Sequence, residues 1–279
     1  MPELPEVETV RSMLEPEIVG CTIVGITLGT FTGVLESLIP GVDPASALKD
    51  TVIRSVWRRG KYLIADLSNG LHLIAHLRMT GRILILPADS PTIRFEHAAI
   101  HLSSGFDLRF GDQRKFGRLT LAAPEDIERL HRRLGPEPFD RRLTSFVLLE
   151  GMRRRPGKIK NALLDQSLIA GLGNIYVDEA LYRTRIHPEQ PSSSLTVEQL
   201  RRLLQAIRLI LRLAIQRQGT TFSSFENPYG EPGDNAGFLR AYGKSRHGGR
   251  CPRCGTPFEK STVGGRGTTF CPRCQVLTP

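Results

Sequence analysis

The sequence lacks the features of a membrane or secreted protein. No purely apolar run reaches the roughly 20 residues that a membrane-spanning helix needs. No basic stretch followed by an apolar one marks a signal peptide at the start of the chain. Internal repeats and low-complexity tracts are also missing. We therefore expect a globular cytoplasmic protein whose five cysteines are reduced or bound to metal rather than paired in disulfides.

Acidic residues are in the minority. The chain of 279 residues has 38 Lys and Arg against 28 Asp and Glu, a formal net charge of +10, and its isoelectric point is about 9.8. Such a surface favours a polyanionic partner, with DNA or RNA ahead of an anionic membrane surface. The sequence contains no evident cluster of Asp, Glu and His of the kind that holds catalytic magnesium, which disfavours a metal-dependent nuclease.

Hydrophobic periodicity divides the chain into regions. With 40% hydrophobic residues the chain can build real cores, and its length favours two domains. A helix is predicted within "PEVETVRSMLEP", and short β-rich runs separated by turn signals fill residues 22–123. Closely spaced short strands predict an antiparallel β-sandwich or barrel, and a helix that starts at Pro124 and ends before Gly135 closes this unit. Helices dominate afterwards, most clearly in "TVEQLRRLLQAIRLILRLAIQRQG", where Thr196 and Gln199 form a capping box.

The C-terminal region predicts a metal site. It contains two Cys-x-x-Cys pairs, Cys251 with Cys254 and Cys271 with Cys274. Four thiolates at this spacing can close a tetrahedron around one structural zinc ion, and the β-like runs between them predict a zinc ribbon. Two disulfides or a redox pair are the alternative, which a reducing compartment disfavours. The remaining cysteine, Cys21, is predicted to be a buried thiol within a strand.

Several motifs together resemble one enzyme family. In order they are "PELPEVE", "RRGKYL", "HLRMTG", "DQRKFG", "GLGNIYVDEALY" and the zinc ribbon with its "GGRG" turn. Taken together they resemble formamidopyrimidine-DNA glycosylase, the bacterial base-excision enzyme for oxidised purines. The resemblance implies an α+β multidomain fold, with an N-terminal antiparallel β-sandwich with flanking helices, a C-terminal helical helix-two-turn-helix domain and a zinc ribbon.

The resemblance also implies how these parts divide the work. The expected domains are a catalytic β-sandwich at 1–135, a DNA-binding helical domain at 136–244 and a zinc-ribbon finger at 245–279. The expected partner is double-stranded DNA that contains oxidised bases or abasic sites. We expect a bacterial, nucleoid-associated protein that acts as a monomer and binds no membrane.

The resemblance implies a catalytic role for the start of the chain, "MPELPEVETV". Once Met1 is removed, Pro2 presents a secondary amine, and the pKa of an ordinary α-amino group, about 8, leaves a useful fraction neutral. Such an amine can displace a damaged base from the sugar and, through a Schiff base, permit strand cleavage by β- and δ-elimination. By resemblance Glu3 is the acid/base residue, Lys61 grips phosphate and donates protons during elimination, and Arg266 assists δ-elimination.

A second group of residues is implied to hold the DNA. A base must leave the stack before it can be attacked, and the vacated space must be filled. Phe116 is expected to wedge between bases, Met79 to fill the space and Arg114 to hydrogen-bond the orphaned partner base. The residues expected to contact phosphates are Arg155, Lys160, Asn174 and Arg266.

The sequence also departs from the family's pattern. Gln113 and Lys115 stand in "DQRKFG" where the family usually has proline and arginine, which softens a rigid turn. Phe95 replaces a histidine often found there, so no phosphate contact is expected from it. Glu6 either assists Glu3 or serves as a first-turn helix charge. The glycine-rich segment 218–237 is expected to be mobile and to close over the flipped base.

Two other functions remain open at this point. A relative of the endonuclease VIII type would prefer oxidised pyrimidines, but the "PELPEV" start and the set of Met79, Arg114 and Phe116 favour the purine branch. A zinc-ribbon DNA-binding protein without catalytic activity would have no need for the Pro2-Glu3 start. The favoured prediction is a bifunctional DNA glycosylase and abasic-site lyase that removes 8-oxoguanine and formamidopyrimidines.

Overall fold

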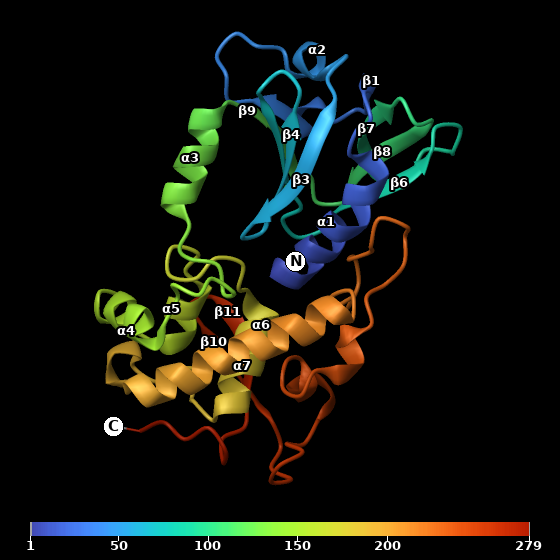
Figure 1. Cartoon of the computed structure of the whole chain (residues 1–279). Helices are drawn as coiled ribbons and strands as arrows, with labels where there is room; N and C mark the ends of the chain where they lie inside the picture. Colours follow the sequence, from blue (N-terminus) through green and yellow to red (C-terminus); the bar gives the residue numbers. More distant parts are fainter. Residues whose placement is uncertain (1, 279) are drawn as a thin grey trace. The chain divides into compact units, whose positions relative to one another are not determined.

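The computed structural model describes residues 2–278, apart from the side chain of His247. The chain divides into two compact units. The first contains Met1–Arg132 and Ile215–Ala236, and the second contains Arg133–Ala214 and Gly237–Pro279. Figure 1 shows the fold, with labels on many of the helices and strands of both units.

Two β-sheets form the body of the first unit. One has the strand order β1-β7-β8-β6 and the other the order β2-β9-β5-β4-β3. Neighbouring strands run antiparallel, except that the short β2 pairs in parallel with β9. The predicted antiparallel sandwich is therefore confirmed, with one short parallel pair at an edge. The strands are β1 (Ile23–Leu28), β2 (Leu35–Ser37), β3 (Ile53–Arg59), β4 (Tyr62–Leu67), β5 (His72–His76), β6 (Gly81–Pro87), β7 (Glu96–Leu102), β8 (Phe106–Asp112) and β9 (Arg118–Ala122).

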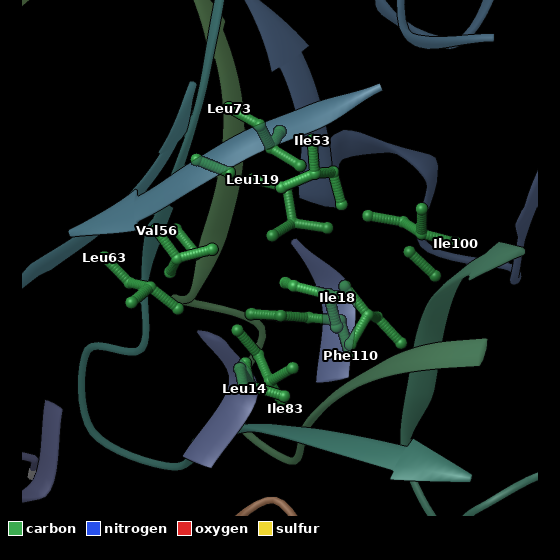
Figure 2. Close-up of a cluster of buried hydrophobic side chains, with 14 of the residues drawn as sticks. Leu14, Ile18, Ile53, Val56, Leu63, Leu73, Ile83, Ile100, Phe110 and Leu119 are labelled. Carbon is green, nitrogen blue, oxygen red and sulfur yellow. The ribbon is translucent and has the colours of Figure 1, made fainter. Parts of the chain in front are cut away.

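The core of this unit lies between the two sheets and the first helix. Figure 2 shows Leu14 and Ile18 near Phe110, with further apolar side chains converging from both sheets. Removing such side chains from water contributes about 1.5–3 kcal/mol each, and α1 supplies a buried face at helical spacing. The two helices that the sequence predicts are present as α1 (Leu4–Ile18) and α3 (Pro124–Arg133). Two short helices that it does not predict, η1 (Thr32–Val34) and α2 (Pro44–Leu48), lie within the β-rich region.

The second unit is helical and ends in a two-stranded ribbon. The predicted capping box is present, because Thr196 N–H donates to Gln199 Oε1 at 2.8 Å and Gln199 N–H donates to Thr196 Oγ1 at 3.2 Å. The antiparallel pairing of β10 with β11 confirms the predicted ribbon hairpin. The elements are α4 (Ser145–Arg153), α5 (Ile159–Leu164), α6 (Asn174–Thr184), η2 (Ser192–Ser194), α7 (Val197–Gln216), η3 (Asn235–Phe238), η4 (Lys244–His247), β10 (Glu259–Val263) and β11 (Arg266–Phe270).

The segment after α7 packs within the first unit. Ile85 N–H donates to Pro228 O at 2.9 Å, and Arg82 forms an ion pair with Glu226 at 2.5 Å. Contacts thus group Ile215–Ala236 with the sandwich, although the segment lies inside the range 136–244 that the sequence analysis treats as one domain. The division into functional domains at 1–135, 136–244 and 245–279 stays a prediction.

Two smaller points concern the chain as a whole. Cys21 is half-buried and lies just before β1, so the prediction of a buried thiol within a strand is wrong. Its thiol lies 3.5 Å from Glu17 O, at the C-terminal end of α1, because the helix has just ended there. Across residues 2–278, no helix is both long and apolar enough to cross a bilayer.

Candidate active site and metal centre

The N-terminal end of α1 fixes the start of the chain. Pro2, Glu3 and Glu6 are all buried. The Glu6 carboxylate accepts hydrogen bonds from Glu3 N–H and from Thr220 N–H, each at 2.8 Å. A Cβ atom at Gly219 would lie 2.9 Å from Glu6 Cγ, and the φ of +83° there also favours glycine. Glu6 is therefore more than a first-turn charge, because it joins the start of the chain to the segment after α7.

Lys61 occupies the turn between β3 and β4 and is largely buried. Arg58 holds this turn near α1, since its Nε lies 3.0 Å from a Glu8 carboxylate oxygen and its Nη1 donates to Gly60 O at 2.9 Å. Helix α1 also packs against β3 and β4. The predicted amine, Pro2, and the predicted cation, Lys61, are thus both carried by the packed body of the first unit.

His76 is a candidate residue that the sequence analysis missed. Burial, together with the positive charges of Arg78 and Lys61, lowers the pKa of His76 to about 3, so the ring is neutral near pH 7. The backbone N–H of Arg78 donates to His76 Nδ1 at 3.0 Å, which leaves the ring proton on Nε2. A neutral imidazole with Nε2–H can donate a hydrogen bond beside Lys61 without adding a further charge.

Asp112, at the end of β8, organises the two turns that carry the predicted base-flipping residues. Its buried carboxylate accepts backbone hydrogen bonds from Arg114 at 3.0 Å, Phe116 at 2.8 Å and Gly117 at 2.6 Å. It also accepts a hydrogen bond from the Thr80 hydroxyl. These bonds constrain the turn even though Gln113 stands where the family usually has proline.

The structure brings the three predicted base-flipping residues together through this carboxylate. Phe116 is 49% exposed, and the Arg114 guanidinium lies over its ring at 4.9 Å from the centroid. Met79 is half-buried and precedes Thr80 in the turn between β5 and β6. An exposed aromatic ring on a braced turn can enter a base stack, whereas a ring buried in the core could not. Phe95 is also exposed, at 39%, and the Arg94 guanidinium lies over its ring at 4.6 Å from the centroid.

The second unit carries the predicted phosphate-binding residues around the start of α6. Asn174 is the first residue of α6 and Gly173 is the N-cap, and the N-terminal end of a helix favours anions. Asn174 Nδ2 donates to Gly267 O at 2.8 Å, which ties the helix start to β11. Arg266 begins β11 and is exposed, next to a turn in which Gly264 and Gly265 have positive φ. Asn174 and Arg266 therefore lie on segments that contact each other directly.

The other two residues predicted to contact phosphates, Lys160 and Arg155, already form ion pairs with aspartates of the protein. Lys160 has no exposed surface, and its ammonium lies 2.5 Å from Asp178 Oδ1. Arg155 Nε lies 2.7 Å from an Asp165 carboxylate oxygen, and its guanidinium also donates to Ser167 Oγ at 2.8 Å. Arg155 keeps part of its side chain exposed, but the burial of Lys160 is at odds with direct contact to a phosphate on the surface.

The four predicted zinc ligands gather at the base of the ribbon. Their Sγ atoms all lie within 4.8 Å of one another. Cys251 and Cys274 have their sulfurs 3.9 Å apart, and Cys254 and Cys271 have theirs 3.5 Å apart. Zinc–sulfur bonds of about 2.3 Å in a tetrahedron place sulfurs about 3.8 Å apart, so the donor set fits one structural zinc ion. The Tyr182 hydroxyl lies 3.3 Å from Cys251 Sγ and links this centre to α6.

The missed residues share a reason for being missed. His76, Asp112 and Asp178 act through partners that are distant in the sequence or through backbone groups, and the same holds for the contact that Glu6 makes with Thr220. No residue type or spacing marks such a role, and only the place of Asp112 at the start of "DQRKFG" could have drawn attention to it.

Comparison with known proteins matches each region of the chain. Residues 1–119 match the formamidopyrimidine-DNA glycosylase N-terminal domain, residues 134–226 match the H2TH domain of the same enzymes, and residues 248–276 match the zinc finger found in FPG and IleRS. The chain is 43% identical to formamidopyrimidine-DNA glycosylase of Herpetosiphon aurantiacus, over 99% of this chain and 100% of that one. The same enzyme of Pelotomaculum thermopropionicum is also 43% identical, with 99% of each chain covered.

Solved structures give the same result. The MutM (Fpg) protein of Thermus thermophilus has a TM-score of 0.87 at 38% identity, with 100% of both chains covered. A MutM in complex with DNA containing carbocyclic 8-oxo-G has a TM-score of 0.88 at 38% identity, over 99% of this chain and 100% of that one. A Lactococcus lactis FPG mutant in complex with Fapy-dG-containing DNA has a TM-score of 0.87, also at 38% identity, with 99% and 100% covered.

Proposed function

Because the chain belongs to the formamidopyrimidine-DNA glycosylase family, we propose that it excises oxidised purines from double-stranded DNA and then nicks the abasic site. The substrates are 8-oxoguanine and formamidopyrimidines, the lesion types bound by its structural relatives. The observation that carries the proposal is the buried Pro2-Glu3 start, held by the Glu6 carboxylate at the end of α1.

Pro2 acts as the nucleophile once Met1 has been removed. Its nitrogen lone pair forms a bond to the sugar C1′, and the glycosidic bond breaks with its electron pair leaving on the base; the amine nitrogen loses its proton, which balances the proton that the departing base takes up. Glu3 donates a proton to the ring oxygen as the sugar opens, which gives an iminium. Loss of the C2′ proton then expels the 3′ phosphate, and a second elimination expels the 5′ phosphate.

The environment of Pro2 favours its neutral, reactive form. The N-terminal end of α1 carries partial positive charge, and it disfavours protonation of an amine placed there. Lys61 lies in a turn braced against the same helix and supplies positive charge for a phosphate. His76, neutral near pH 7, adds a hydrogen-bond donor at Nε2.

Base flipping depends on the two turns held by Asp112. Phe116 inserts between bases, Met79 fills the vacated space and Arg114 hydrogen-bonds the partner base. The hydrogen bonds to Asp112 support this assignment, because they hold the backbone N–H groups of Arg114 and Phe116 and the hydroxyl of Thr80, the residue after Met79, before DNA binds.

The second unit holds the phosphates that flank the lesion. Asn174 and the start of α6 bind one phosphate through N–H groups, and Arg266 supplies a guanidinium that also assists δ-elimination. Arg155 contributes through the exposed part of its side chain. Cys251, Cys254, Cys271 and Cys274 hold a structural zinc ion, which stabilises the ribbon that carries Arg266 and takes no part in the chemistry. The protein works as a monomer on the DNA of the bacterial nucleoid.

Borohydride trapping across a panel of lesions tests the proposal. Reduction of the Schiff base should link the wild-type chain to DNA that contains 8-oxoguanine, and only weakly to DNA that contains thymine glycol. Pro2→Gly should lose most of the trapping, whereas Pro5→Ala, a matched control one turn into the same segment, should keep it. Efficient trapping on thymine glycol alone would instead identify a pyrimidine-specific enzyme, and no trapping on any lesion would leave a DNA-binding protein without catalysis.

A further inference from the structure

A buried ion pair connects α5, α6 and the zinc ribbon. Lys160 on α5 and Asp178 on α6 have 0% and 1% of their side chains exposed, and their charged atoms are 2.5 Å apart. Burial raises the pKa of Asp178 to about 6, with the nearby Lys160 opposing the shift. A buried charge pair is costly to desolvate and gives little net stability, so stability alone does not explain this pair. An attested use of such a pair is to fix one particular arrangement of the elements around it.

Both partners of the pair reach across to β11. Asp178 uses its second oxygen, Oδ2, to accept a hydrogen bond from Thr269 N–H at 3.0 Å. Lys160 Nζ donates to Gly267 O at 3.2 Å, and this same carbonyl accepts the hydrogen bond from Asn174 Nδ2 at 2.8 Å. Gly267 directly follows Arg266. One backbone carbonyl therefore joins the buried pair, the first residue of α6 and the residue next to the exposed arginine.

The tip of the ribbon lies close against α5. A Cβ atom at Gly264 would lie 2.2 Å from Asn161 Oδ1, so the backbone of the turn approaches the residue that follows Lys160. Helix α6 and strand β11 pack against each other within this unit. The zinc ion closes the opposite end of the hairpin, at the cysteines, and leaves the position of the tip to these contacts.

From this network we propose that Lys160 and Asp178 are positioning residues that set the tip of the ribbon on α6, so that Asn174 and Arg266 form a single phosphate clamp. The inference rests on the proposed function for the identity of the ligand, which is a DNA phosphate beside an abasic sugar. Neither residue of the pair touches the DNA. The role assigned to Lys160 thereby changes from a phosphate contact to a buried anchor.

The first test observes the free protein and needs no activity. Hydrogen exchange of the amides at 264–270 is compared in wild type, Lys160→Met, Asp178→Asn and the control Lys158→Met, with zinc content measured in each. Lys158 is an exposed neighbour whose ammonium pairs with Glu189 at 2.9 Å, so its replacement removes the same charge without disturbing the core. The amides at 264–270 should exchange about tenfold faster or more in Lys160→Met and Asp178→Asn than in wild type, and Lys158→Met should exchange as wild type does. Each variant should retain one zinc ion per chain.

Two results of this test would overturn the proposal. Unchanged exchange in both buried variants would mean that the pair does not hold the tip. Loss of zinc in either variant would mean that the pair is needed to fold the ribbon rather than to place its tip. Neither result depends on catalysis, so each is distinct from a failure of the proposed function, in which the wild-type enzyme would not be trapped on lesion DNA.

The second test measures affinity for duplex DNA that contains a reduced abasic-site analogue. Lys160→Met and Asp178→Asn should each weaken binding by about 10- to 100-fold, the range for a misplaced contact. The double variant should bind no more weakly than the worse single one, because the two residues act as one unit. Asp178→Glu, which keeps the charge, should recover part of the loss.

This test also separates the buried anchor from a direct phosphate contact. If Lys160 itself gripped DNA, Asp178→Asn would release its ammonium and binding would hold or strengthen. Unweakened binding by Asp178→Asn, or losses that multiply in the double variant, would contradict the positioning role.

Discussion

The β-sandwich and the zinc ribbon both present reactive side chains on turns, but they hold those turns by different means. The sandwich buries a large apolar core between its sheets and α1 (Figure 2). The buried cluster beside the ribbon is small and consists of Tyr182, Ala241, Cys251, Phe258 and Cys271, of which two are zinc ligands. Burial of apolar surface can therefore fix the first group of residues, whereas the second depends on metal and on a buried ion pair.

In each region a different set of interactions fixes the position of the functional side chains. In the sandwich, carboxylates such as Glu6 and Asp112 gather backbone N–H groups and so brace turns on a body that is already stable. In the ribbon, the zinc centre supplies the stability and the pair of Lys160 and Asp178 supplies the placement. Perturbing each region should therefore have separable effects.

Removal of zinc should give the largest effect. Structural zinc contributes about 10–16 kcal/mol to the folding of zinc-finger peptides, and the small cluster around the ribbon cannot replace it. Chelation, or Cys271→Ala, should abolish hydrogen-exchange protection in residues 251–274 and lower strand cleavage on the order of 100-fold. The melting transition of the sandwich should persist. A ribbon that stays protected without metal would contradict the comparison.

Leu14→Ala should destabilise the sandwich without affecting the ribbon. Leu14 is 1% exposed, and removing a buried leucine typically costs about 2–5 kcal/mol. Thermal unfolding should therefore begin at a lower temperature, while zinc content stays at one ion per chain. Leu38→Ala, at an exposed position, is the control and should change stability by less than about 0.5 kcal/mol. Loss of zinc in the Leu14 variant would show that the two regions are not separable.

Asp112→Asn should impair base flipping more than abasic-site cleavage. Asparagine has one acceptor oxygen, so some of the N–H groups now bound to Asp112 lose their partner, at about 1–3 kcal/mol. Excision of 8-oxoguanine from duplex DNA should fall about tenfold. Trapping on a preformed abasic site should change less, and the exposed neighbour variant Gln113→Ala should behave as wild type. Equal losses in both reactions would argue against a role in flipping.

The last expected effect is a pH dependence at the buried pair. The pKa of Asp178 is raised to about 6 by burial, so the folded protein takes up a proton there between about pH 6 and pH 4 that the unfolded chain does not. The destabilising cost of ionised Asp178 is thus present above pH 6 and is relieved as the pH falls toward 4.

The same protonation makes the wild type resemble Asp178→Asn. The ratio of their dissociation constants for abasic-site DNA should be large at pH 8 and approach one near pH 5. A ratio that does not change between these values would mean that the charge on Asp178 has no part in placing the ribbon.

Local patterns in the sequence predicted the elements and the metal centre. Alternating apolar residues marked the strands of the sandwich, the apolar stripe and the capping box of Thr196 and Gln199 marked α7, and two Cys-x-x-Cys pairs marked the zinc site. These signals depend on neighbours within one element or one hairpin, so they can be recognised without the fold.

The polar networks could not be predicted in the same way. Glu6 meets Thr220 across 214 residues, and Lys160 meets Gly267 across 107. A lysine in "IKNALL" is expected to be exposed, because burial of an ammonium is favourable only when a specific partner is present. Whether Lys160 is buried depends on which side of α5 faces α6 and β11. Helical periodicity alone does not determine that side.

The most direct test of the chemistry is peptide mapping of the borohydride-trapped complex by mass spectrometry. The bound deoxyribose should lie on the nitrogen of Pro2 as the first residue of the chain, in molecules that have lost Met1. A cross-link on a lysine such as Lys61, or on chains that still carry Met1, would contradict it.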